Sequence, residues 1–205
     1  PQDLPDQDAR ADDIRSVMDA AGCGRAALIG ASDGAALALL FAAAYPERVR
    51  ALIVHCGLVR GPDHGRFAQR KEPPPQDIAA DWGTGAAVLR LAPSRQHDPV
   101  FAAWCGRLER LSASPAAAAA QALMADRATS RPTLDRITAP TLVICRDADP
   151  RCGPEMGRSL AQSVRGARLV ALSGGDHPIW VGDVDATADL VEEFLTGEKP
   201  VMQSD

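Results

Sequence analysis

The sequence predicts an α/β protein in which helices flank a parallel β-sheet. The apolar run Ala26–Ile29 has the length of a strand and meets a glycine and then a helix-forming run rich in Ala and Leu. The stretch 49–56 is apolar on both faces, which is typical of a strand in a parallel sheet that helices cover on each side. The stretch 139–145 is a second apolar run of this kind, and helical patterns follow both.

Taken in order, residues 1–10 are expected to form a loose lead-in, and Asp12 or Asp13 starts a helix that Gly22 ends. The helix after the first strand runs to Ala44 or Tyr45, where a proline stops it. The later elements are a strand at 139–145, a helix at 155–164, a strand at 167–172 and a helix at 183–195, with a frayed end from Thr196.

The region 58–135 interrupts this alternation because it contains helical patterns and no strand. Three helices are expected in it, at 76–91, 99–111 and 114–128. The sequence therefore predicts a core of residues 1–57 and 136–205 with an all-helical cap inserted at 58–135. Trp82 and Trp104 are expected to anchor the packing of this insertion, with a role in lining a substrate pocket as the alternative.

Composition narrows the function classes. The 205 residues suffice for one domain, and the net charge of −5 argues against a nucleic-acid partner or an anionic membrane surface. No apolar run reaches transmembrane length, and the acidic start is unlike a signal peptide. The five scattered cysteines indicate reduced thiols and a cytoplasmic location, and no zinc-binding spacing is present, so no metal and no cofactor are expected.

The stretch Gly30-Ala31-Ser32-Asp33-Gly34 fits the G-x-S-x-G pattern of a nucleophile elbow, in which a sharp strand-to-helix turn exposes a serine hydroxyl. The pattern needs a strand before it and a helix after it, and both are predicted here. Close packing of strand on helix is expected to require glycine at both flanking positions. The competing interpretation is a glycine-rich turn that carries an ordinary serine.

A nucleophilic serine needs a histidine base, and the base needs a carboxylate to orient it. Ser32, Asp149 and His177 each follow a predicted strand, so they would meet at the carboxyl edge of a parallel sheet. Their order along the chain, Ser then Asp then His, is the order that nucleophile-elbow hydrolases use. The sequence therefore predicts a catalytic triad of these three residues.

Other residues near the predicted triad received different interpretations. Asp147 is the rival of Asp149 for the acid, whereas Asp176 is interpreted as a turn residue. His55 lies within a strand and is expected to be a packed core histidine. The remaining histidines, His64 and His97, lie in predicted loops with no partner that the sequence indicates.

Several passages together resemble the α/β-hydrolases, most closely those found beside or fused to class III nucleotide cyclase domains. These passages are Asp13–Gly22, Gly30–Gly34, Tyr45–Val49, Trp82–Gly85, Ala139–Val143, Gly175–His177 and Trp180–Asp183. The resemblance implies an α/β-hydrolase fold with Ser32 as nucleophile, His177 as general base and then acid, and Asp149 as the orienting carboxylate. It also implies that the backbone N–H of Asp33 donates to the oxyanion.

The sequence departs from this family at its start, because members have several strands before the elbow strand and here only a helix precedes it. The chain thus looks truncated at its N-terminus, without the loop that supplies the second oxyanion donor. The elbow strand would then be an open edge of the sheet, which is expected to pair with a missing N-terminal segment or with a second copy in a homo-oligomer.

Two functions follow from these features. The first is a serine hydrolase that cleaves a small, fairly apolar carboxylic ester through an acyl-enzyme, without a cofactor. The second is a regulatory or interaction module that keeps the triad residues as relics and pairs with itself or with a cyclase-type partner. The intact Ser32, Asp149 and His177 favour the first, and the missing oxyanion loop favours the second.

Overall fold

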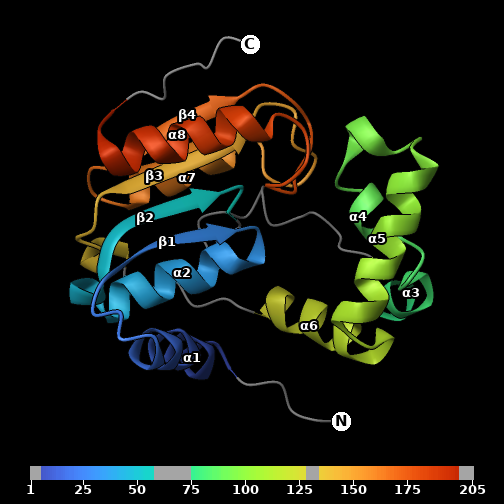
Figure 1. The fold of residues 1–205 in the computed structure, drawn as a ribbon, viewed down its shortest axis with the longest axis horizontal. Helices are drawn as coiled ribbons and strands as arrows, with labels where there is room; N and C mark the ends of the chain where they lie inside the picture. Colours follow the sequence, from blue (N-terminus) through green and yellow to red (C-terminus); the bar gives the residue numbers. More distant parts are fainter. Residues whose placement is uncertain (1–5, 58–74, 128–133, 199–205) are drawn as a thin grey trace.

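The computed structural model describes residues 6–57, 75–127 and 134–198 (Figure 1). Its sheet has four strands in the order β1-β2-β3-β4, all parallel. The strands are β1 (Ala26–Ala31), β2 (Val49–His55), β3 (Thr141–Arg146) and β4 (Arg168–Leu172). The predicted parallel α/β fold is confirmed, and the strand bounds lie within two residues of those expected.

Helices cover the two faces of the sheet unequally. The sheet and the helices packed with it form one part of the molecule, called the sheet half below. These helices are α1 (Gln7–Ala20), α2 (Asp33–Ala44), α7 (Pro154–Ser163) and α8 (Val184–Thr196). Alternate residues of β2 face opposite sides, as the pleat requires: Leu52 and Val54 belong to the core beneath α2 and α7, and Ile53 belongs to the core beneath α8. Figure 1 shows α8 over β3 and β4 but not over β1, which agrees with Ile29 of β1 being 53% exposed.

The first helix starts earlier than predicted. The Asp6 side chain accepts a hydrogen bond from the N–H of Ala9 at 2.8 Å, so it caps α1 one residue before Gln7. Ala11, in the second turn, is buried against the core and keeps this start in place. The expectation of a loose lead-in was therefore wrong for residues 7–10. At the other end of the chain, α8 includes Thr196, which was expected to be frayed.

The helices between β2 and β3 lie together at one side of the sheet half, on the right in Figure 1. They are α3 (Pro75–Asp81), α4 (Ala86–Leu89), α5 (Pro99–Ser112) and α6 (Pro115–Arg127). Trp82, as expected, anchors packing within this helical insertion, since its Nε1–H donates to the carbonyl of Ala113 at 2.8 Å. Residue 128, the last of the third predicted helix, lies outside the described residues.

The helix predicted over 76–91 was wrong, because the chain breaks it into α3 and α4. Gly83 and Gly85 have φ values of +92° and +85°, in the left-handed region that ends helices. The buried carboxylate of Glu109 on α5 accepts hydrogen bonds from both of their N–H groups, at 2.8 and 2.9 Å. A Cβ at Gly85 would lie 2.4 Å from the carbonyl oxygen of Ala102, so close packing on α5 also requires glycine there.

No helix among the described residues has the length and apolar character needed to cross a membrane.

The two glycines of the elbow motif, Gly30 and Gly34, differ in the space available for a side chain. A Cβ at Gly30 would lie 2.7 Å from the Cβ of Ala38 and 2.8 Å from the Cα of Ala35, so α2 packs directly on this position. A Cβ at Gly34 would meet nothing within 4 Å. The expectation that both flanking positions exclude side chains is therefore correct for Gly30 and wrong for Gly34.

This difference gives a paired prediction. Gly30→Ala should lower the free energy of unfolding by about 2 kcal/mol, because the added methyl forces α2 away from β1. Gly34→Ala should leave it within about 1 kcal/mol, since the methyl points into open space and alanine favours a helix. Urea unfolding of the two variants measures both effects, and equal losses would contradict the packing described here.

Candidate active site

Ser32 lies at the turn between β1 and α2. Its φ of +53° is one that residues other than glycine rarely adopt, and it stores strain that the surroundings must offset. The Ser32 N–H donates to the carbonyl of His55 at 3.1 Å, and the Ser32 carbonyl accepts from the N–H of Ala35 at 3.1 Å. The end of β2 and the first turn of α2 therefore hold the backbone of the serine in place.

Asp149 lies in the loop after β3, and its side chain is buried. Its Oδ1 accepts hydrogen bonds from the N–H groups of Arg151 at 2.6 Å and Cys152 at 3.1 Å, so the loop wraps around the carboxylate. Burial by itself would raise the pKa of Asp149. The hydrogen bond with His177, the charge of that residue and the Arg151 N–H outweigh burial and lower the pKa to about 2, which keeps the group ionised near neutral pH.

His177 lies in the loop after β4 and connects the other two residues. Its Nδ1 is 2.8 Å from Oδ2 of Asp149, and its Nε2 is 2.8 Å from Oγ of Ser32. An ionised carboxylate only accepts hydrogen bonds, so Nδ1 of His177 carries the proton and donates a hydrogen bond to Asp149. In the neutral ring Nε2 is then an acceptor, and the Ser32 hydroxyl donates to it. The structure thus brings together the three residues that the sequence selected.

The residue after the serine was predicted to supply the oxyanion donor. Asp33 is the first residue of α2, so its N–H has no acceptor within the helix and lies where the helix dipole favours negative charge. The Asp33 side chain is half exposed and forms an ion pair with Arg151 at 3.3 Å. This ion pair places the Asp33 side chain beside the loop that carries Asp149.

Asp147, the rival of Asp149, and His97 lie outside the line of hydrogen bonds through Ser32, His177 and Asp149. Asp147 is exposed, and its Oδ1 accepts the N–H of Gly174 at 2.9 Å, so it supports the loop and Asp149 makes the contact with His177. His97 is exposed and lies 3.1 Å from the amide of Gln96, a partner that the sequence did not indicate. His64 lies outside the described residues.

Sequence reasoning missed three buried polar residues around the site. Arg146 was assigned to a loop, but it is the last residue of β3 and only 1% exposed. Asp176 was interpreted as a turn residue, but it is buried and its Oδ1 accepts the N–H of Ser94 at 3.0 Å. Cys56 has a positive φ of +47° and a buried thiol. Their position at or just beyond the carboxyl ends of strands is the one signal that could have marked them.

Among the described residues, one group could offer three ligands to a metal: Cys56, Asp149 and His177, whose ligating atoms lie within 4.8 Å of one another. Burial and the charge of Asp149 raise the pKa of the Cys56 thiol well above its usual range. The thiol therefore stays protonated, whereas metals bind the thiolate. The Asp149 carboxylate and Nδ1 of His177 already bond each other, so hydrogen bonding accounts for this group.

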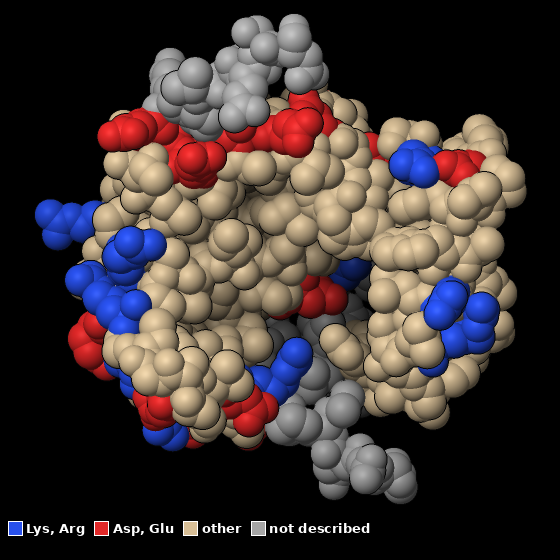
Figure 2. Space-filling view, in the orientation of Figure 1, with Lys and Arg blue, Asp and Glu red and all other residues tan. Residues whose placement is uncertain are grey.

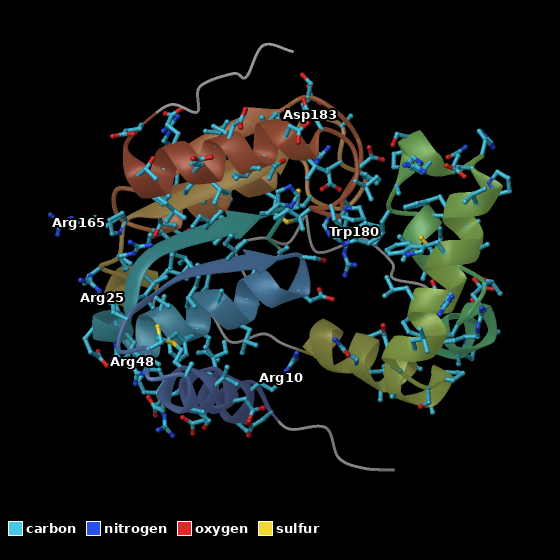
Figure 3. All side chains as sticks on the ribbon, in the orientation of Figure 1. Arg10, Arg25, Arg48, Arg165, Trp180 and Asp183 are labelled. Atoms are coloured by element: carbon cyan, nitrogen blue, oxygen red, sulfur yellow. The ribbon has the colours of Figure 1, made fainter. Side chains whose placement is uncertain are left out.

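Three aromatic rings lie beside the loop of His177. Trp104 of α5 meets Trp180 edge to face with ring centroids 5.3 Å apart, and Phe101 lies 6.1 Å from Trp104 and 6.0 Å from Trp180. Figure 3 shows Trp180 on the side of the sheet half that faces the insertion. Trp104, expected to anchor the insertion or alternatively to line a substrate pocket, is 49% exposed and contacts Trp180 of this loop. Figure 2 shows the surface hollowed between the two halves, with largely uncharged walls.

A parallel sheet flanked by helices, with a serine on a strand-to-helix turn at its carboxyl edge, defines the class of α/β hydrolases. Residues 1–192 match the model of the alpha/beta hydrolase family, and the chain belongs to that family. The fold and the esterase relatives described next place it among esterase-like enzymes.

Named relatives include esterases and a lactonase. The pimeloyl-[acyl-carrier protein] methyl ester esterase of Neisseria meningitidis serogroup B (strain MC58) is 28% identical over 203 residues, which cover 92% of this chain and 74% of that protein. The enol-lactonase from Burkholderia xenovorans LB400 superposes with a TM-score of 0.75 at 25% identity, covering 94% of this chain and 74% of that one. A thermophilic esterase from Thermogutta terrifontis shares the fold, with a TM-score of 0.74 at 23% identity over 95% of this chain and 73% of that one.

The buried His55 should make the stability of the fold depend on pH. His55 is fully buried, as the sequence predicted; burial and the charge of Arg146 lower its pKa to about 4. The unfolded chain binds this proton near pH 6.5 and the folded chain does not. The free energy of unfolding should therefore fall by about 3 kcal/mol as the pH drops from about 7 to 4 on account of this residue.

Chemical denaturation at pH 7 and pH 4 measures this loss. His55→Gln should show a smaller fall than the unmodified chain, whereas His97→Gln, at an exposed position, should show the same fall. An identical pH dependence in His55→Gln would contradict the assignment.

Proposed function

We propose that this chain is a serine hydrolase that cleaves carboxylic esters through an acyl-enzyme, with Ser32, His177 and Asp149 as its catalytic triad. The observation that carries the proposal is the continuous hydrogen-bonded line from Ser32 Oγ through His177 to Asp149, with 2.8 Å at each contact. Membership of the alpha/beta hydrolase family and the esterase relatives support it.

Acylation follows from the directions of these hydrogen bonds. Ser32 Oγ attacks the ester carbonyl carbon while its proton passes to His177 Nε2, and Asp149 stabilises the imidazolium that forms. The carbonyl oxygen becomes an oxyanion, which the N–H of Asp33 is placed to bind at the start of α2. His177 then gives the proton to the alcohol oxygen as the C–O bond breaks, and the alcohol leaves.

Deacylation repeats these steps with water. His177 takes a proton from water, the hydroxide oxygen attacks the acyl carbon, and the oxyanion forms again at the same place. When the bond to Ser32 breaks, the proton returns from His177 to Oγ and the carboxylic acid leaves. Both halves of the reaction use the side chains of Ser32, His177 and Asp149, the backbone N–H of Asp33, and water.

The helices between β2 and β3 support a cap over the site and an apolar substrate. Phe101 and Trp104 of α5 meet Trp180, three residues after His177, so an apolar wall lies next to the catalytic loop. We assign residues 58–135 to this cap and a small, fairly apolar ester to the pocket beneath it. The Neisseria relative is named for a methyl ester of an acyl chain, which agrees with this chemical class.

All five cysteines are free, and four of them are buried. Unpaired, buried thiols support residence in a reducing compartment, for which we propose the cytoplasm.

Labelling by a fluorophosphonate probe, read by intact mass, tests the proposed function. The unmodified chain should gain one adduct, because His177 activates the Ser32 hydroxyl toward the electrophilic phosphorus. Ser32→Ala should gain none, and Asp149→Ala should label about 10³-fold or more slowly. A well-folded chain that gains no adduct would contradict the proposal.

One observation favours a second candidate, an interaction module. Among the described residues β1 pairs with β2 alone, and Ile29 on its uncovered face is half exposed, so this edge could pair with a second copy. The sequence resemblance to hydrolases found beside class III nucleotide cyclase domains adds a cyclase-type domain as a proposed partner for this candidate. Absence of labelling, together with a dimeric mass by light scattering that Ile29→Lys reduces to a monomer, would favour it.

A further inference from the structure

The loop that carries His177 is tied to the helical insertion as well as to the sheet. The N–H of His177 donates to the carbonyl of Leu91 at 2.7 Å. The N–H of Ser94 donates to Oδ1 of Asp176 at 3.0 Å. The catalytic loop donates in the first hydrogen bond and accepts in the second, and each bond joins residues more than eighty positions apart. Together they connect the turn after α4 to Asp176 and to His177, the proposed base.

The Asp176 side chain that accepts the Ser94 N–H is buried. Asp176 is 3% exposed, and Arg146 is 1% exposed. Both groups border Gly182, where a Cβ would lie 2.8 Å from Oδ2 of Asp176 and 2.3 Å from Nη1 of Arg146. Arg146 in turn donates from Nη2 to the carbonyl of Val181 at 2.7 Å. Burying a carboxyl group is costly unless donors compensate for the lost water, and the Ser94 N–H is one such donor.

We propose that Asp176 is a positioning residue, which fixes His177 against Ser32 by bonding the catalytic loop to the helical insertion. It acts through its neighbour and does not touch the substrate. The proposal rests on the proposed function, because it assigns Asp176 a role in the reaction of Ser32.

The geometry explains why a short loop needs this tie. His177 must keep Nε2 at 2.8 Å from Ser32 and Nδ1 at 2.8 Å from Asp149 at the same time. Asp149 holds one side of the ring, but the backbone of the loop can still pivot about that contact. The bonds from Leu91 and Ser94 remove this pivot, and a shift of about 1 Å at a reacting group can cost on the order of a hundredfold in rate.

Three substitutions of Asp176 separate its hydrogen bond with Ser94 from its carboxyl group. Asp176→Ala removes both, and Asp176→Asn keeps an oxygen at the position that accepts from Ser94. Asp176→Glu keeps a carboxyl group near Arg146 but displaces the accepting oxygen. The matched control is Asp147→Ala in the neighbouring loop. Asp147 accepts a hydrogen bond from Gly174, three residues before His177, and forms no hydrogen bond with the described residues of the insertion.

The readouts are the rate of fluorophosphonate labelling of Ser32, kcat and KM on a short ester, and the downfield proton resonance of His177 Nδ1–H. Asp176→Ala and Asp176→Glu should label about 10- to 100-fold more slowly and lower kcat equally, with KM within about threefold. Asp176→Asn should stay within about fivefold of the unmodified chain. Asp147→Ala should stay within about twofold and keep the downfield resonance, which Asp176→Ala broadens.

A labelling rate in Asp176→Glu equal to that of the unmodified chain would overturn the proposal, as would equal slowing by Asp147→Ala, which would indicate general loosening of the loop. If Asp176→Ala does not fold, the contrast between the Asn and Glu variants decides. Absence of labelling in the unmodified chain contradicts the proposed function itself, and loss of the Nδ1–H resonance in Asp176→Glu would then still report the positioning role.

Discussion

The close approach of α2 to β1 is the constraint on which the site depends. At Gly30 the helix lies so near the strand that a methyl group would meet two alanines of α2, and the chain must therefore turn within one residue. Ser32 takes that turn with a positive φ, and the carbonyl of His55 on β2 accepts its N–H. Strain at the Ser32 backbone is thus offset by packing along a whole helix, and the hydrogen bond with His177 Nε2 orients the hydroxyl.

The parallel arrangement of the strands brings the other site residues together, because the loops that follow parallel strands lie at the same edge of the sheet. The charges that gather there need partners, since each is buried. Asp149 has two backbone N–H groups and His177, and Arg146 has the Val181 carbonyl and lies near Asp176. The ionised Asp149 in turn fixes which nitrogen of His177 carries the proton.

The sequence was sufficient wherever a signal is local. Apolar runs marked the strands, and a serine, an aspartate and a histidine directly after three of them marked the candidate site. Contacts between distant residues were invisible: the break between α3 and α4 depends on Glu109, a residue more than twenty positions away, and the role of Asp176 depends on Ser94. A glycine motif alone also cannot tell which glycine is packed, and only the position of α2 separates Gly30 from Gly34.

The helical insertion has two kinds of contact with the carboxyl edge of the sheet. Its aromatic residues Phe101 and Trp104 meet Trp180 in the loop after β4. Its backbone at Leu91 and Ser94 forms hydrogen bonds with the same loop, at His177 and Asp176. The short segment between α4 and α5 makes the second contact and leads directly into α5, which carries the two aromatic residues. The position of His177 therefore depends on how the insertion packs as well as on the sheet.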